Sequence, residues 1–284
     1  MIVMSNNQWK CDGNLEAWKK QGLDCSAEVR VKGLLRAYRR ILPDLAGLQE
    51  VSIRMADLMM AGLYEVKTDG GDVARYDYVS GGDTPLFYRI DRFKLLESGF
   101  FRYPEEIPGL EGSFNNSETK SYAFGVFEDR KTGKRVALMS THLWWKSSDP
   151  ASPEYQKDSN KARAWQIRLA SARMDGVMAE YACPGILLGD LNASMTSLCL
   201  DAAREEGWRE VHDLALGEKD ETKGHHPCNG AGFARGEPGR FADAIDHILV
   251  KNQGEMKINS FRRLRDAWFD PISDHYPLYA DITL

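Results

Sequence analysis

Asp190 and Asn192 follow a short apolar run and are well placed in this sequence to do chemistry. The run leaves a Pro184-Gly185 turn and stops at Gly189, which is typical of a buried strand ending where loops and ligands meet. Residues spaced i, i+2 on a strand point to the same side. A carboxylate beside a carboxamide can hold a water molecule and a polar substrate oxygen together. An ordinary turn remains the alternative for this stretch taken alone, because Asp and Asn are common in turns.

Polar side chains end other apolar runs in the same manner. The full set is Asn7, Glu50, His142, Asp190, Asn192, Asp246, Asp274 and His275. Carboxylates crowded together repel one another and raise one another's pKa values. A hard divalent cation offsets this repulsion, and oxygen ligands with retained water suit Mg²⁺. A metal, a base and hydrogen-bond donors together suit hydrolysis of a phosphate ester, so we expect these residues to converge.

Composition limits the classes of protein to consider. The chain has 284 residues, 43% hydrophobic and 28% charged, which suffices for a large core. A net charge of −5 argues against long-range attraction to a polyanion, although a local basic groove stays open. The five cysteines form no CxxC pair, which favours a reducing compartment over a disulfide framework. We expect a cytoplasmic protein, because the first predicted strand begins at Ile2 and no apolar run could span a membrane.

Strands and helices alternate along the predicted chain. Helical spacing predicts helices over 26–42, 53–63, 160–181 and 197–206. Strands are predicted over 2–5, 45–51, 74–101, 121–127, 136–143, 185–189, 244–250 and 279–284. Polar loops are expected over 105–120, 146–159 and 217–239, the last beside a site. No repeat or linker divides the chain, so we predict one domain over 1–284.

Five segments carry a family resemblance. In chain order they are Leu48-Gln49-Glu50-Val51, Ser140-Thr141-His142-Leu143, Gly189-Asp190-Leu191-Asn192-Ala193, Ile245-Asp246-His247-Ile248 and Ser273-Asp274-His275-Tyr276-Pro277. They resemble the motif series of the endonuclease/exonuclease/phosphatase superfamily, which includes pancreatic deoxyribonuclease and the abasic-site endonucleases. Met4-Ser5-Asn6-Asn7 is similar to its opening motif, and the segment 88–93 resembles a strand of its bacterial members. The resemblance covers nearly the whole chain. It implies an α/β four-layer sandwich, in which two packed mixed β-sheets are flanked by helices, with the site at one end.

The resemblance also implies a metal side to that site. Glu50 is similar to the principal Mg²⁺ ligand, and Asp274 to a further carboxylate on the metal side. Asn7 resembles a neighbour of the metal and the phosphate. Mn²⁺ is expected as a substitute for Mg²⁺.

The remaining motif residues resemble the groups that handle water and phosphate. Asp190 is similar to the residue that orients or deprotonates the attacking water, and Asn192 to one that holds water or a phosphoryl oxygen. His142 takes the position of a phosphate contact. Asp246 resembles the acid that orients the site histidine, His275. Whether Asp190 or His275 acts as the base stays open.

Departures from the family pattern bear on the substrate rather than on the chemistry. Ala244 stands where many members carry a basic residue, and Asn6 replaces an apolar or aromatic one. Trp144-Trp145-Lys146 is an insert. Its two indoles could stack on a base or sugar, or simply pack at the root of a loop.

The histidines outside the expected site set have two interpretations. His225 and His226 could border a substrate pocket. With His212 and His247 they could instead form a transition-metal site, but ordinary loop and strand-end positions are favoured. The basic segment 261–265 is interpreted as a solvated strand face rather than a phosphate contact.

These observations predict a Mg²⁺-dependent phosphoesterase that acts on a phosphodiester by metal-assisted attack of water. The expected partner is a phosphate ester, such as single-stranded nucleic acid or a small phosphodiester. One alternative is a hydrolase of phospholipid or sugar-phosphate head groups. Another, of a different class, is a non-catalytic binding module, although buried uncompensated acids are costly without a role. Endo or exo cleavage, mono- or diesterase action, the number of metals and the oligomeric state stay open.

Overall fold

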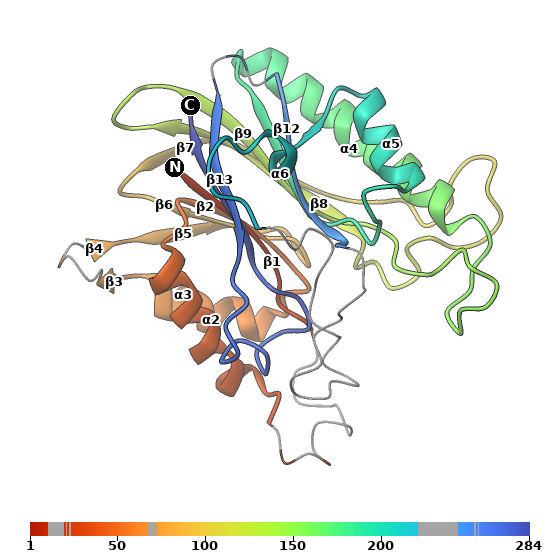
Figure 1. The fold of residues 1–284 in the computed structure, drawn as a ribbon, viewed down its shortest axis with the longest axis horizontal. Helices are drawn as coiled ribbons and strands as arrows, with labels where there is room; N and C mark the ends of the chain where they lie inside the picture. The colour runs from red at the N-terminus through yellow and green to blue at the C-terminus, as the bar shows by residue number, and fades with distance from the viewer. Residues whose placement is uncertain are drawn as a thin grey trace.

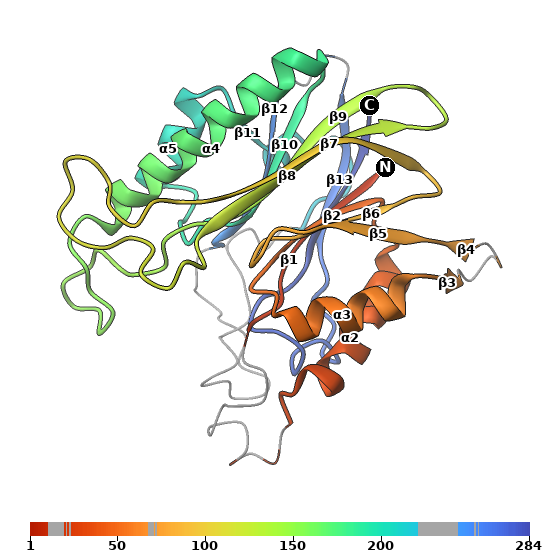
Figure 2. The same ribbon diagram turned by 180° about the vertical axis from the view of Figure 1, so that it is seen from behind.

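Two β-sheets pack face to face, and helices cover the outer face of each (Figures 1 and 2). The computed structural model describes residues 1–10, 20, 22, 24–67, 71, 73–220, 244–252, 254 and 256–284. Helices α2 (Ala27–Ile41) and α3 (Ile53–Leu63) cover the first sheet. Helices α4 (Ser159–Tyr181) and α5 (Leu198–Glu205) cover the second. The predicted four-layer sandwich is therefore confirmed.

The first sheet contains both described ends of the chain. Its strands, in spatial order, are β13 (Lys257–Arg263), β14 (Leu278–Thr283), β1 (Ile2–Asn7), β2 (Leu45–Gln49), β6 (Leu86–Arg89) and β5 (Tyr76–Val79). Strands β1 and β2 are parallel, and the other neighbours are antiparallel. A small separate hairpin joins β3 (Val66–Lys67) to β4 (Val73–Ala74).

The second sheet carries most of the predicted motifs. Its strands, in spatial order, are β11 (Arg209–Glu210), β12 (Asp246–Lys251), β10 (Gly185–Asp190), β9 (Arg135–His142), β8 (Ser121–Asp129) and β7 (Phe93–Arg102). A short helix, α6 (Val211–Leu214), follows β11 directly. Strands β9 and β10 are parallel, whereas their outer neighbours run antiparallel to them. The predicted hairpin of β8 and β9 and the loop over 105–120 are confirmed.

Three apolar layers separate the four layers of backbone. Val3 and Leu45 of the first sheet meet Leu138 and Ile186 of the second in the central core. A second cluster lies between the first sheet and α2 and α3, and a third lies between the second sheet and α4 and α5. Each of these four helices thus buries one face against one sheet, which is why helical spacing predicted them.

Strand register brings three motif residues side by side. Asp190 on β10 pairs with His142 on β9 and with Asp246 on β12. In the first sheet, Asn7 at the end of β1 pairs with Gln49, so Glu50 follows directly. Because β1 and β2 are parallel, as are β9 and β10, the carboxyl ends of these strands meet at one end of the sandwich.

Two glycines allow the backbones near this end to come close. A Cβ atom on Gly47 would lie 2.1 Å from Leu188 Cδ1 of the opposite sheet. A Cβ atom on Gly189 would lie 1.9 Å from the carbonyl oxygen of Thr141, and its φ of +148° is one that side chains rarely adopt. Only glycine therefore fits the strand position just before Asp190.

Gly189→Ala is expected to lower the free energy of unfolding by about 2 kcal/mol or more, because the added methyl group overlaps backbone rather than a movable side chain. Gly176→Ala is the matched control, since Gly176 lies in α4 with nothing within 4 Å of its would-be Cβ atom. That change should raise stability by about 0.5–1 kcal/mol. Urea unfolding of both variants measures this, and a Gly189→Ala protein as stable as the wild type would contradict it.

Candidate active site

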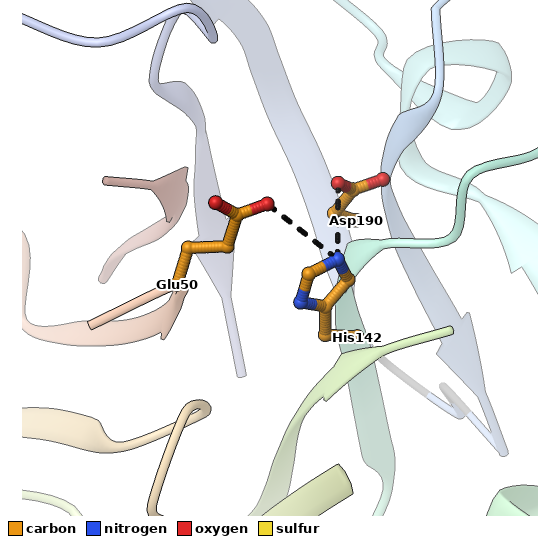
Figure 3. Close-up of side chains that lie close together, drawn as sticks. All are labelled: Glu50, His142 and Asp190. Carbon is orange, nitrogen blue, oxygen red and sulfur yellow. Dashed lines mark ion pairs between the residues drawn. The ribbon is translucent and has the colours of Figure 1, made fainter. Parts of the chain in front are cut away.

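A cavity of about 520 Å³ opens where the strand ends meet. Its lining includes most of the predicted site residues, together with four that the sequence patterns did not mark, Lys10, Asp83, Thr119 and Lys120. The lining residues are Lys10, Glu50, Asp83, Thr119, Lys120, His142, Trp145, Asp190, Asn192, Ile245, Asp274 and His275. Figure 3 shows how Glu50 from the first sheet faces His142 and Asp190 from the second. The predicted convergence of these side chains is thus observed.

Asn7 joins the two sheets by bridging two acids that line the cavity. Its Nδ2 donates to Glu50 Oε1 at 3.2 Å and to Asp190 Oδ2 at 3.0 Å. Its Oδ1 accepts a hydrogen bond from the backbone amide of Trp9 at 2.9 Å. The carboxamide therefore spaces two acids that would otherwise repel each other, and its own position is fixed by backbone.

Two buried side chains hold the loops that carry the other site residues. Ser273 Oγ donates to the backbone oxygen of Asn7 at 2.7 Å and accepts from the amide of His275 at 3.2 Å. Arg30 of α2 donates through one nitrogen to the backbone oxygens of Gln8 and Ile272. Arg30 carries no sequence signal for this role, because an arginine on a helix is usually solvated.

Asp190 is held on both oxygens. Its Oδ1 accepts from the backbone amide of Asn192 at 2.9 Å, and its Oδ2 accepts from Asn7. Oδ2 also lies 3.5 Å from His142 Nε2 and 3.9 Å from His275 Nε2. Asn192 has a left-handed backbone, with φ 48°, and donates from its carboxamide to the backbone oxygen of Leu143. The carboxylate thus sits between both histidines in one fixed orientation.

Asp246 and His275 form a buried pair. His275 Nδ1 lies 2.7 Å from Asp246 Oδ2, so the ring donates its Nδ1–H to the carboxylate and turns Nε2 toward the cavity. Burial alone would lower the pKa of His275, but the charges of Asp246 and Asp274 raise it well above its ordinary value. The pair predicted from the sequence is present. His275, however, lies in the loop before β14, not on a strand.

A second histidine is held in the same way by a residue that the motifs did not mark. His142 Nδ1 lies 3.1 Å from Asp83 Oδ2, and His142 Nε2 lies 2.6 Å from the Lys120 amine. Asp83 precedes β6 within a stretch predicted only as strand-like, and Lys120 ends a stretch predicted as a loop. Neither Asp83 nor Lys120 lies in a local sequence pattern that predicts a role in the site.

The acids on the first-sheet side fit a divalent cation. Asp274 Oδ1 is buried and has no hydrogen-bond partner within the described part of the chain. Burial and the negative charges of Glu50 and Asp190, only partly offset by His275, raise the pKa of Asp274 to about 7. Such an oxygen close to other carboxylates gains most from a hard cation such as Mg²⁺.

Glu50 offers the partly open carboxylate that such a cation needs. Its side chain is 30% exposed, and burial would raise its pKa, but the positive charges of His142 and Lys120 bring the pKa below its ordinary value. Glu50, His142 and Asp190 present ligand atoms within 4.8 Å of one another, as do Asp190, Asp246 and His275. Of the two sets, only the first includes a partly exposed ligand, Glu50, and so leaves a position open to solvent.

The residues predicted to contact substrate differ in how exposed they are. Trp144 is wrong as a stacking residue, because its side chain is fully buried against Phe114. Trp145 is 43% exposed and lines the cavity, so stacking of its indole on a substrate stays a prediction. His225 and His226 lie outside the described residues, as does nearly all of the predicted 217–239 loop.

The other predicted histidines have ordinary surroundings. His247 is buried, with Nε2 donating to the backbone oxygen of Ala193 at 2.8 Å and Nδ1 lying 3.3 Å from Glu210 Oε2. His212 lies 3.0 Å from Asp213. In the part of the chain that the structure describes, neither belongs to a group of acids and histidines able to hold a metal.

Solved structures of known proteins share this architecture. A Bacteroides thetaiotaomicron endonuclease/exonuclease/phosphatase family protein matches with 19% identity and a TM-score of 0.73, over 99% of this chain and 97% of that one. The chain has the endonuclease/exonuclease/phosphatase fold. A mannosyl-6-phosphatase of the same organism matches with 19% identity and a TM-score of 0.73 over 100% of both chains. D. rerio TDP2 complexed with a single-strand DNA product matches with 15% identity and a TM-score of 0.65, over 100% of this chain and 99% of that one.

No family model and no curated protein sequence matches the chain. At the identities given above, the similarities to solved structures establish the fold. None of the described helices combines the length and apolar composition that crossing a bilayer requires.

Asp246→Asn is expected to cut phosphoester turnover on the order of a hundredfold or more, because the variant no longer fixes and charges His275. His275→Ala should lose a similar amount. The double variant should lose little more than either single one, since the pair acts as a unit. Turnover of all three at saturating Mg²⁺ measures this, and additive losses would show that the residues act independently.

The pair of His247 and Glu210 should make stability depend on pH. Burial alone would lower the pKa of His247, but Glu210 and the backbone oxygen of Ala193 raise it above the ordinary 6.5. A raised histidine pKa contributes stability that is complete below pH 6.5 and is lost as pH rises through the raised value. The difference in unfolding free energy between wild type and His247→Gln should therefore shrink as pH rises.

Urea unfolding of both proteins from about pH 5.5 to pH 9 measures this difference, in which the titration of other groups largely cancels. His247→Gln with Glu210→Gln is the matched control, because it removes both charges and should recover part of the loss. A difference that stays constant across this range would mean that folding does not raise the proton affinity of His247.

Proposed function

We propose that this protein is a Mg²⁺-dependent phosphoesterase that hydrolyses a phosphodiester, with residues 1–284 as one catalytic domain. The observation that carries this proposal is the convergence of Glu50, Asp190 and Asp274 with two carboxylate-held histidines around one cavity. Acids for a metal, a fixed base and donors for phosphoryl oxygens are the groups that this reaction needs.

In this proposal Glu50 and Asp274 hold the metal. When bound, Mg²⁺ offsets the charge of the phosphoryl group and lowers the pKa of coordinated water. The unpartnered Oδ1 of Asp274 and the half-open carboxylate of Glu50 support these roles. Asn7 spaces Glu50 from Asp190 and so keeps the metal side apart from the water side.

In this proposal Asp190 and His275 orient the attacking water, and one of the two receives its proton. Asp190 is fixed through both oxygens, with Asn192 beside it. The Asp246 carboxylate holds the His275 ring so that Nε2 faces Asp190 across the cavity at 3.9 Å. A water between these two atoms is aimed at phosphorus by hydrogen bonds to both. Comparing the turnover of Asp190→Asn with that of His275→Ala distinguishes the base from the residue that only positions the water.

A second candidate is hydrolysis of a sugar-phosphate or phospholipid head group. The similar mannosyl-6-phosphatase supports it, whereas the similar TDP2 with its DNA product supports a nucleic-acid phosphodiester. The exposed Trp145 at the cavity rim suits either a sugar ring or a base. Turnover of single-stranded DNA, RNA, nucleotides, sugar phosphates and phospholipids decides between the two.

The proposal includes Mn²⁺ as a substitute metal and a cytoplasmic location. The described cysteines Cys183 and Cys199 are free and buried, which is consistent with a reducing compartment.

Glu50→Gln keeps the shape of the side chain but removes a charge from the proposed ligand set. Mg²⁺ affinity, measured by calorimetry, should fall on the order of tenfold or more. Turnover of bis(p-nitrophenyl) phosphate and p-nitrophenyl phosphate should fall with it, and the wild type should need added Mg²⁺. Glu111→Gln, at an exposed loop position, is the matched control. Unchanged Mg²⁺ affinity in Glu50→Gln would rule out Glu50 as the ligand, and a wild type that hydrolyses neither ester would favour a binding module.

A further inference from the structure

Lys120 is a buried cation that faces the cavity. Lys120 is only 4% exposed, yet it lines the same cavity as Glu50, Asp190 and His142. Its backbone is fixed just before β8, because Asn115 donates to its carbonyl oxygen and accepts from its amide. The amine therefore has little freedom to reach solvent in place of the site.

Asp83 and His142 fix the direction of this amine. Asp83 Oδ2 lies 3.1 Å from His142 Nδ1, and the Lys120 amine lies 2.6 Å from His142 Nε2 and 3.3 Å from Nδ1, beside the ring. The Lys120 amine therefore lies against an imidazole ring that Asp83 holds in place.

The Lys120 ammonium has more N–H donors than it has acceptors among the described residues. It carries three N–H groups, and His142 is its only hydrogen-bond partner within the described residues. Its charge also acts on Glu50, Asp190 and Asp83, none of which comes within 4.0 Å of it to form an ion pair. A buried cation with free donors is costly unless a ligand rich in oxygen atoms completes its shell.

We propose that Lys120 binds a non-bridging oxygen of the substrate's phosphoryl group, and that Asp83 and His142 are positioning residues that aim it. This inference rests on the proposed function. It changes the role that the family resemblance implied for His142, which here acts on the phosphate through Lys120. Because the same charge faces Glu50 and Asp190, Lys120 opposes binding of a divalent cation while it favours binding of phosphate.

Lys120→Met tests this by its opposite effects on two ligands. With saturating Mg²⁺, calorimetry should show inorganic phosphate binding weakened on the order of tenfold to a hundredfold, as for loss of a hydrogen bond from a charged donor. Mg²⁺ binding without phosphate should be equal to or tighter than in the wild type. A merely structural role would instead weaken both. Lys120→Arg, which keeps the charge, should retain much of the phosphate affinity.

Lys10→Met is the matched control, because Lys10 lies at the same cavity, 3.5 Å from Asp83, with a side chain that is 43% exposed. An exposed lysine should contribute much less, about threefold or less. If Lys10→Met lost as much phosphate affinity as Lys120→Met, general charge rather than a placed donor would explain the effect, and the inference would be overturned.

Asp83→Asn supplies a second variant that does not touch Lys120. It should weaken phosphate binding, and it should add little to the loss in Lys120→Met, because both changes disable the same donor. Additive losses would remove the positioning role of Asp83. A wild type that turns over phosphoesters while Lys120→Met binds phosphate normally would overturn this inference alone. A wild type that binds neither Mg²⁺ nor phosphate would overturn the proposed function as well.

Discussion

Mutual repulsion of buried acids is the constraint that organises this end of the sandwich. Glu50, Asp190 and Asp274 come from three separate segments, yet they share one cavity. Asp274 shows the cost most directly, because burial and its acidic neighbours raise its pKa to about 7. The protein offsets the repulsion with Asn7 between two of the acids and with the Lys120 amine beside His142. Part of the negative charge of the acids stays unbalanced. A bound cation would balance it, and this is the basis of the proposed chemistry.

The scaffold keeps these groups together by backbone rather than by side-chain pairing alone. Strand register sets His142 and Asp246 on either side of Asp190, and Gly189 allows β10 to run close to Thr141. Arg30 of α2 ties the loop after β1 to the loop before β14, because it donates to the backbone oxygens of Gln8 and Ile272. The acids therefore cannot relax apart without loss of sheet pairing or buried hydrogen bonds.

The fold and the motif residues could be predicted because each leaves a local pattern. Apolar runs of strand length that end in Glu50, His142 or Asp190 can be recognised from spacing, and helical periodicity gave α4 to within one residue of its ends. The pairing of Asp246 with His275 followed from the resemblance, not from spacing, since only tertiary structure joins them.

The other contributors could not be predicted from local pattern. Asp83 and Lys120 lie in segments without periodicity, and their roles arise from contacts with His142 across the fold. Arg30 looks like any helix-surface arginine until the loops are folded over it. Trp144 failed for the opposite reason, because neighbouring tryptophans look alike in sequence although only Trp145 is exposed.

We infer that the acids at this end of the sandwich hold a divalent metal on the side of Glu50 and Asp274. A crystal structure of the protein with Mn²⁺ is the decisive measurement, since anomalous scattering locates the ion. We expect a peak about 2.0–2.3 Å from carboxylate oxygens of both residues. No peak in the cavity, or a peak bound by Asp190, Asp246 and His275 while Glu50 and Asp274 remain free, would contradict it.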